Sequence, residues 1–299
     1  MPDFPIVDAH VHLYDPARID YPWMANVPLL REPHLPERFR AASAPVEVSD
    51  MVFVEVDAAP GRHLDEVAFI EELAGSEPRL GAMVASMPLE RGEAVLADLE
   101  SYASTGLARG VRRLIQNHED EPGWALREPF VAMVGALARF DLGFDLCIRH
   151  TQLPDAIALV RRCPEVRFVL DHIGKPPIRE GVMEPWRARL TELAAEPNVW
   201  CKLSGVVTEA DHERWTVEEI APYVAHAIER FGFERIMYGG DWPVSRLATD
   251  YARWVETLDR IVAGSSPEEL RRLYRDNARA FYRIEAEPDE GSPRRGERD

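Results

Sequence analysis

The sequence predicts a single-domain (β/α)8 barrel, and three observations support this fold class. Eight apolar runs alternate with helical patterns along the 299 residues. Successive runs start about 33 residues apart, which fits a strand, a covering helix and two loops. Most runs are apolar throughout, as expected for buried parallel strands. The strand count favours a barrel over a doubly wound sheet, and no GxGxxG motif follows the first strand to support a nucleotide-binding fold.

The expected strands are the apolar runs, taken in chain order between turn residues. They cover residues 6–13, 50–58, 80–89, 106–116, 143–150, 166–174, 198–206 and 235–244. The expected helices lie between or after them, several starting with an acidic or hydroxyl residue and Pro. They cover residues 63–75, 91–104, 128–140, 153–163, 184–196 and 216–231, and two more near 249–263 and 266–283 close the chain.

Two segments stand outside this repeat. Residues 14–49 form a long, proline-rich connection, and loops of this length are usually functional, so we expect it to cover the barrel mouth. The barrel domain is expected to span residues 1–284. The polar stretch 285–299 is expected to be disordered.

Composition limits the partners of the chain. A net charge of −17 argues against a nucleic-acid-binding surface, which needs a basic patch. No signal-peptide pattern opens the sequence, and no apolar run approaches the roughly 20 residues that span a bilayer. The three cysteines, Cys147, Cys163 and Cys201, form no close pair and are expected to be free thiols in a reducing compartment. We therefore expect a cytoplasmic protein with a small-molecule partner, and a homo-oligomer stays open.

Candidate site residues stand where the strands end, because active sites of these barrels gather at the carboxyl ends of the strands. His10 and His12 are two residues apart on one strand, so their side chains share a face about 6–7 Å apart and can converge on one centre. His172 and Asp241 are expected at the same level of the barrel. Asp171, which precedes His172, is expected to point the opposite way, toward a helix cap or an arginine.

These residue types suit hydrolysis of an activated acyl bond by either of two routes. Imidazoles and a carboxylate bind ions such as Zn²⁺ and leave a position open for water. Without a metal, His10, His12 and His172 can donate hydrogen bonds to a carbonyl oxygen as negative charge develops on it. In both routes Asp241 takes a proton from water and returns it to the leaving group.

Several longer motifs carry a resemblance to a known family. They are "DAHVHLYDP" (8–16), "YPWM" (21–24), "GVRRLIQ" (110–116), "VLDHIGKPPI" (169–178), "CKLSGVVTEAD" (201–211), "YGGDWPV" (238–244) and "DNARAFYRI" (276–284). Over residues 4–284 the chain resembles the amidohydrolase superfamily, and most of all its branch of L-fuconolactonase and L-rhamnonolactonase relatives. The resemblance implies a hydrolase that opens the lactone ring of a sugar acid, with Asp241 as general base and His172 as its catalytic partner.

The strand ends also suggest the residues that contact substrate and metal. Substrate contacts are assigned to Arg112, His150 and Lys202, and pocket walls to Trp23 and Trp242. The metal ligands are expected to be His10, His12, Glu55 and Asp241. The superfamily's bridging lysine on strand four has no counterpart here, because that strand carries Arg112 and Arg113, which speaks against a binuclear site. One divalent ion, zinc first, is the expected cofactor, and metal-independent activity stays open.

Two other functions fit parts of the pattern. Relatives with this fold decarboxylate aromatic or semialdehyde acids, and Arg112, Arg113 and Arg149 could bind such a carboxylate. A barrel that binds a sugar acid without turnover is the third alternative. It is disfavoured because convergent polar groups are costly to bury without a use.

Overall fold

The structure, a computed structural model, describes residues 2–285 and confirms the predicted (β/α)8 barrel. Eight parallel strands are hydrogen-bonded in the order of the sequence. They are β1 (Ile6–Val11), β2 (Val48–Val54), β3 (Leu80–Ser86), β4 (Ala108–Leu114), β5 (Gly143–Cys147), β6 (Phe168–Leu170), β7 (Val199–Leu203) and β8 (Ile236–Tyr238). Residues 286–299 of the predicted tail lie outside the described residues.

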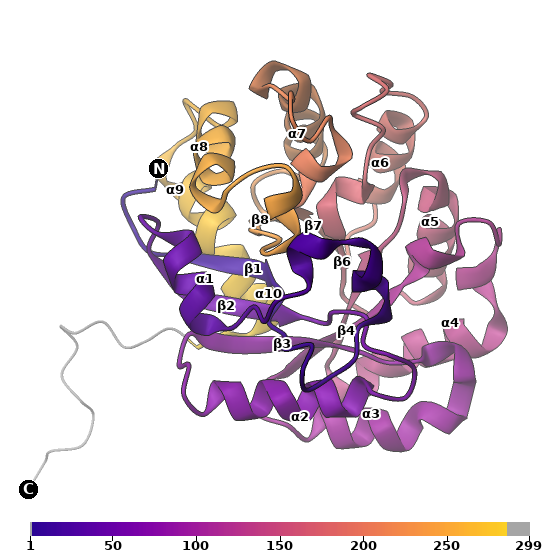
Figure 1. Cartoon of the computed structure of the whole chain (residues 1–299). Coiled ribbons are helices and arrows are strands. Elements are labelled where there is room, and N and C mark those ends of the chain that lie inside the picture. The colour runs from indigo at the N-terminus through magenta and orange to yellow at the C-terminus, as the bar shows by residue number, and fades with distance from the viewer. Residues whose placement is uncertain (1, 286–299) are drawn as a thin grey trace, which may run out of the picture.

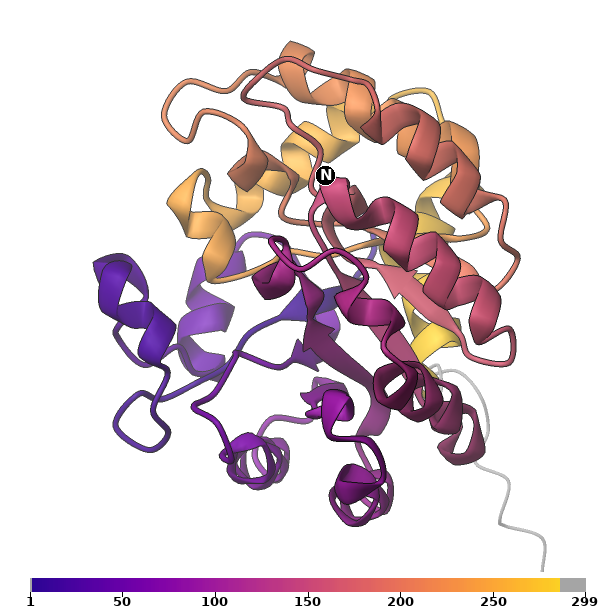
Figure 2. The same ribbon diagram turned by 90° about the vertical axis from the view of Figure 1, so that its right-hand side faces the viewer.

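Helices surround the strands on the outside of the barrel (Figures 1 and 2). They are α1 (Pro36–Ser43), α2 (His63–Ala74), α3 (Leu96–Ala103), α4 (Glu128–Ala136), α5 (Leu153–Arg162), α6 (Trp186–Ala194), α7 (Val217–Phe231), α8 (Tyr251–Ile261), α9 (Pro267–Arg271) and α10 (Asn277–Tyr282). Local sequence fixes several helix starts. At α7, Thr216 and Glu219 form a capping box, in which each side chain accepts a hydrogen bond from the backbone N–H of the other.

The two ends of the barrel differ in what fills them. At the amino ends of the strands, Phe281, Tyr282 and Ile284 pack with strand residues such as Val52 and Val84, so the chain's last described segment closes that end. Polar side chains occupy the other end. The centre of the barrel is therefore filled by apolar side chains at the amino ends of the strands, and its polar residues lie toward their carboxyl ends.

The connection after β1 is more ordered than the sequence suggested. It contains short 3₁₀ turns at Pro22–Asn26 (η1) and Pro28–Leu30 (η2), and then helix α1. In Figure 1 this indigo segment lies in front of the strands, and in Figure 2 it projects at the same end of the barrel. A parallel barrel carries its mouth at that end, so the segment lies where the sequence placed it.

Two other features bear on the expected location. All three cysteines are buried and free. Within residues 2–285, no helix combines the length and the hydropathy that crossing a membrane requires.

Candidate active site

The barrel closes between β8 and β1, at the residues that carry the candidate chemistry. The Asp241 backbone N–H donates to the His10 carbonyl at 2.9 Å, and the His12 N–H donates to the Trp242 carbonyl at 2.8 Å. The end of β8 is thereby held beside the end of β1. This pairing explains how a residue 229 positions after His12 comes to share its site.

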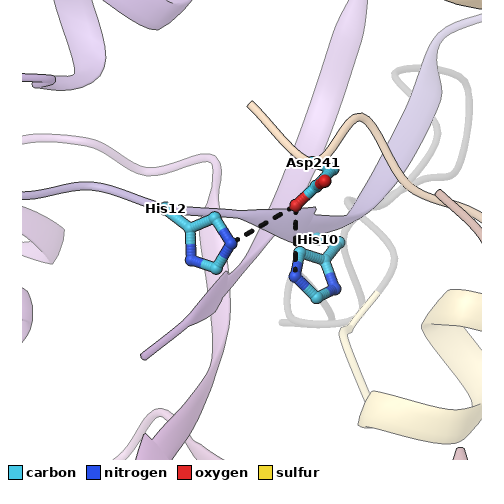
Figure 3. Close-up of side chains that lie close together, drawn as sticks. All are labelled: His10, His12 and Asp241. Carbon is cyan, nitrogen blue, oxygen red and sulfur yellow. Dashed lines mark ion pairs between the residues drawn. The ribbon is translucent and has the colours of Figure 1, made fainter. Parts of the chain in front are cut away.

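One oxygen of Asp241 faces both histidines of the His-x-His motif (Figure 3). Asp241 Oδ1 lies 3.4 Å from His12 Nε2 and 3.6 Å from His10 Nε2. His12 Nδ1 lies 2.8 Å from the Val54 carbonyl, which can only accept, so Nδ1 carries the proton and Nε2 keeps its lone pair. The structure thus brings together three of the residues selected from the sequence.

A pocket of about 270 Å³ opens above this cluster. Its walls come from the ends of seven strands and from the loop after β1. They are lined by His12, Trp23, Glu55, Val56, Asp57, Arg112, Leu114, Gln116, Asn117, Cys147, His172, Lys175, Thr208, Asp241 and Val244. The pocket lies at the carboxyl ends of the strands, where the candidate residues were expected.

His172 approaches Asp241 from β6 because the backbone there leaves the extended conformation. The φ of His172 is +54°, and Asp241 itself has a φ of +52°, a region that non-glycine residues rarely occupy. The Ser204 hydroxyl lies 2.9 Å from His172 Nδ1. The His172 and His10 rings lie 4.6 Å apart between centroids, so three imidazoles surround one carboxylate.

Asp171 does not point away from the site as the alternation of a strand predicts. Its Oδ1 lies 3.4 Å from His10 Nδ1 and 3.1 Å from the Lys202 ammonium, and its Oδ2 accepts from Arg112 at 3.3 Å. The arginine contact was expected, but the direction was wrong. Because His172 adopts a positive φ, the chain turns after Asp171 and both side chains face the inside of the barrel.

Beneath the pocket, Lys202 belongs to a buried layer of charges. The Lys202 ammonium is 0% exposed and donates to Asp145 Oδ2 at 2.5 Å, with Asp171 and His10 Nδ1 as its other neighbours. These carboxylates hold the pKa of Lys202 above its usual value despite its burial. Lys202, expected to contact substrate, does not line the pocket, and its position is that of a residue supporting His10 from below.

Glu55 and Arg112 line the pocket but are engaged with each other. Arg112 donates to Glu55 Oε1 at 2.6 Å and to the Glu55 carbonyl at 2.7 Å. The other carboxylate oxygen of Glu55 accepts from the Asp57 backbone N–H at 2.7 Å. With both oxygens occupied, Glu55 stands apart from the group of His10, His12 and Asp241, whose ligand atoms lie within 4.8 Å of one another.

Of the remaining residues predicted to contact substrate, one lines the pocket and two do not. Trp23 lines the pocket, and its indole N–H donates to the Val56 carbonyl at 2.7 Å. Trp242 is 1% exposed and packs against His34 and Phe39 behind the pocket wall. His150 does not line the pocket either, and its Nδ1 instead donates to the Lys175 carbonyl at 3.1 Å.

Burial sets the protonation state of the cluster at neutral pH. It lowers the pKa of His172 to about 4 and that of His10 well below its usual value, so both imidazoles are neutral. Burial alone would raise the pKa of Asp241, but the facing His172 and the nearby His12 and His10 outweigh it and hold that pKa well below its ordinary range. The site therefore presents an ionised carboxylate beside the neutral rings of His10 and His172.

This donor set fits a single divalent cation. His12 Nε2 has its lone pair directed at Asp241, and His10 Nε2 is free to coordinate when Nδ1 donates to Asp171. Two imidazoles and a carboxylate leave further positions open. Arg112 Nη1, which lies 3.3 Å from His10 Nε2, competes for the same lone pair.

Sequence reasoning gave no role to two residues that the structure brings into the pocket. Lys175 and Gln116 lie at the ends of two expected strands, but nothing in their spacing links them. Their side chains meet across the end of β5, with Lys175 Nζ donating to Gln116 Oε1 at 2.5 Å. A contact between residues 59 positions apart leaves no local signal in a single sequence.

Comparisons with known proteins agree with the fold and place the chain in a family. The model of the family described as Amidohydrolase matches residues 7–284. The L-fucono-1,5-lactonase of Burkholderia ambifaria is 32% identical over 287 residues, covering 93% of this chain and 96% of that protein. That of Burkholderia multivorans is 34% identical over 264 residues, covering 85% and 87%. A Burkholderia multivorans amidohydrolase solved with bound zinc superposes with a TM-score of 0.85 at 32% identity, covering 94% of this chain and 100% of that one. The barrel, the residues at its mouth and these matches together show that the chain belongs to the amidohydrolase family.

Proposed function

We propose that this chain hydrolyses the lactone of a sugar acid, with L-fucono-1,5-lactone as the first substrate to test. The observation that carries the proposal is the buried, ionised Asp241 carboxylate, which faces three imidazoles in a pocket sized for a small molecule. Relatives at 32–34% identity are lactonases. They do not favour the decarboxylase or the non-catalytic alternative.

The chain's own residues supply an acid–base path. Asp241 takes a proton from a water molecule as that water attacks the lactone carbonyl carbon. With Ser204 donating to His172 Nδ1, the neutral His172 ring carries its proton on Nε2 and can donate a hydrogen bond, without transferring the proton, to the carbonyl oxygen as negative charge develops. The bond from the carbonyl carbon to the ring oxygen then breaks, and the ring oxygen receives the proton from Asp241. Lactone and water become a hydroxy acid.

Acid release from a panel of aldonolactones, followed with a pH indicator, tests this function. We expect turnover well above the spontaneous rate for a six-carbon sugar lactone, and no CO₂ from benzoate-type acids. A folded protein that accelerates no lactone in the panel contradicts the proposal.

We further propose that His10, His12 and Asp241 hold one zinc ion, as the solved relative with bound zinc suggests. A bound ion of this kind polarises a carbonyl and lowers the pKa of bound water. We expect about one zinc per chain by elemental analysis, lost in His12→Ala. Activity should fall with removal of the ion by a chelator and return on zinc addition. Full activity in metal-free protein contradicts this part alone.

Gly205 should be essential because it leaves room for the reacting groups. Its φ is +56°, and a Cβ there would lie 2.5 Å from Asp241 Oδ2 and 2.6 Å from His172 Nδ1. We expect Gly205→Ala to lower kcat about 100-fold, because displacement of about 1 Å suffices for such a loss. Gly181→Ala is the matched control, since Gly181 has a φ of +66° and a Cβ there would meet nothing within 4 Å. Equal losses of activity in both variants would show that backbone strain, rather than crowding of Asp241, is responsible.

A further inference from the structure

Lysine is rare in this chain, and its two lysines lie at different depths of the barrel. Of the 35 Lys and Arg residues, only Lys175 and Lys202 are lysines. A lysine differs from an arginine in presenting a compact ammonium with three rotatable donors. Lys202 is buried beneath His10, whereas Lys175 lines the pocket itself.

Lys175 has unused hydrogen-bonding capacity that faces the pocket. Within residues 2–285, its ammonium has one hydrogen-bond acceptor, Gln116 Oε1, and no carboxylate oxygen within 4.0 Å. Arg112, the other cation of the lining, is instead occupied by Glu55 and Asp171. Lys175 is therefore the cation of the lining that is free to bind a ligand oxygen.

The backbone holds Lys175 in an orientation that few side chains would adopt unaided. Its φ is +50°, its N–H donates to the His172 carbonyl at 2.9 Å, and its own carbonyl accepts from His150. His150, predicted to bind substrate, thus acts on the pocket through Lys175.

The position of Lys175 relative to Asp241 determines which part of a bound lactone Lys175 contacts. Lys175 follows β6 and reaches over the end of β5 to Gln116, which follows β4. In a barrel ordered β1 to β8, these strands lie across from the β8–β1 junction that carries Asp241. A lactone whose carbonyl lies beside Asp241 turns its far side toward Lys175.

The groups around Lys175 suit hydroxyls better than an anion. Gln116, Asn117 and Thr208 are neutral hydrogen-bonding residues of the lining, and Asp57 adds a carboxyl group to the same pocket. Asp57 would repel a carboxylate or sulfonate but accepts a hydrogen bond from a hydroxyl.

We propose that Lys175, held by Gln116 and His150, is a specificity-determining residue that binds a hydroxyl oxygen of a polyhydroxylated lactone on the side of the ring opposite Asp241. The inference rests on the proposed lactonase function and adds the residue that selects a sugar lactone over an unsubstituted one.

The first test compares two lactones in wild type and Lys175→Met. For L-fucono-1,5-lactone we expect kcat/KM to fall at least about tenfold, mainly through KM, because ground-state binding is lost. For δ-valerolactone, which has the ring but no hydroxyls, we expect a change of less than about twofold. Equal losses on both substrates, or no loss on the sugar lactone, would overturn the proposal.

A second test does not depend on turnover, so it separates this inference from the proposed function. Acetic anhydride labels accessible amines, and mass mapping reports Lys175 alone because Lys202 is 0% exposed. We expect L-fuconate to protect Lys175 and 5-hydroxyhexanoate, the same acid without the additional hydroxyls, to leave it reactive. Protection by both acids, or by neither, would overturn the proposal even if wild type hydrolyses no lactone.

Discussion

Asp241→Asn is expected to lower kcat for lactone hydrolysis by at least about 10³-fold, equivalent to roughly 4 kcal/mol of transition-state stabilisation. The amide has nearly the shape of the carboxylate but cannot take a proton from water. The facing imidazoles hold the pKa of Asp241 low, so the carboxylate is present throughout the neutral range. Initial rates of acid release at saturating lactone measure the effect.

The matched control is Asp98→Asn, because Asp98 also pairs with a histidine but lies outside the pocket. Its Oδ2 is 2.9 Å from His63 Nε2. We expect wild-type kcat in this variant and melting temperatures close to wild type in both. If Asp241→Asn retains more than a tenth of wild-type kcat while the control behaves as expected, Asp241 is not the general base.

The strands and their carboxyl ends could be predicted because they depend on local, one-dimensional patterns. Runs such as 50–58 are apolar because both faces of a parallel strand are buried, and parallel strands bring their carboxyl ends to one mouth. His12, His172 and Asp241 were found for this reason. Helix α1 was not predicted within 14–49, where proline-rich sequence suggested a loop, although Pro36 lies in its first turn, where proline is well tolerated.

Depth within the barrel could not be predicted from the sequence. A strand-end position does not tell whether a polar side chain reaches the pocket or a layer below it. Lys202 lies in β7 and Ser204 directly follows that strand, yet Lys202 pairs with Asp145 in the interior whereas Ser204 contacts His172. The direction of the Asp171 side chain was predicted wrongly because the positive φ of His172 breaks the strand alternation that the prediction assumed.

Lys202→Met is expected to cause the largest loss of stability of any single change considered for this barrel. It leaves Asp145 and Asp171, both 0% exposed, without their ammonium partner. Removal of one member of a buried ion pair costs about 3–5 kcal/mol because a charge stays buried without compensation. Urea unfolding followed by tryptophan fluorescence measures the loss.

The control and a second variant separate charge from packing. Arg161 also pairs with two carboxylates, those of Glu192 and Glu196, but is 51% exposed, so Arg161→Met should cost less than about 1 kcal/mol. Adding Asp145→Asn to Lys202→Met removes one uncompensated charge and should recover at least about 1 kcal/mol.

The pH dependence of the free energy of unfolding separates an uncompensated charge from a packing defect, because only the charge titrates. In wild type the Lys202 ammonium and His10 hold the pKa of Asp171 well below its usual value. The ionised Asp171 therefore stabilises the folded state at every pH above the pKa of the unfolded chain, and this stabilisation is lost only as the pH falls toward the pKa of the folded protein. In Lys202→Met the pKa of Asp171 rises, and the destabilisation is relieved as a carboxyl that has lost its ammonium partner takes up a proton. The stability difference between wild type and variant should therefore narrow from about pH 7 to pH 5. A difference that is constant with pH, or no recovery on adding Asp145→Asn, would mean that lost packing, not uncompensated charge, destabilises the variant.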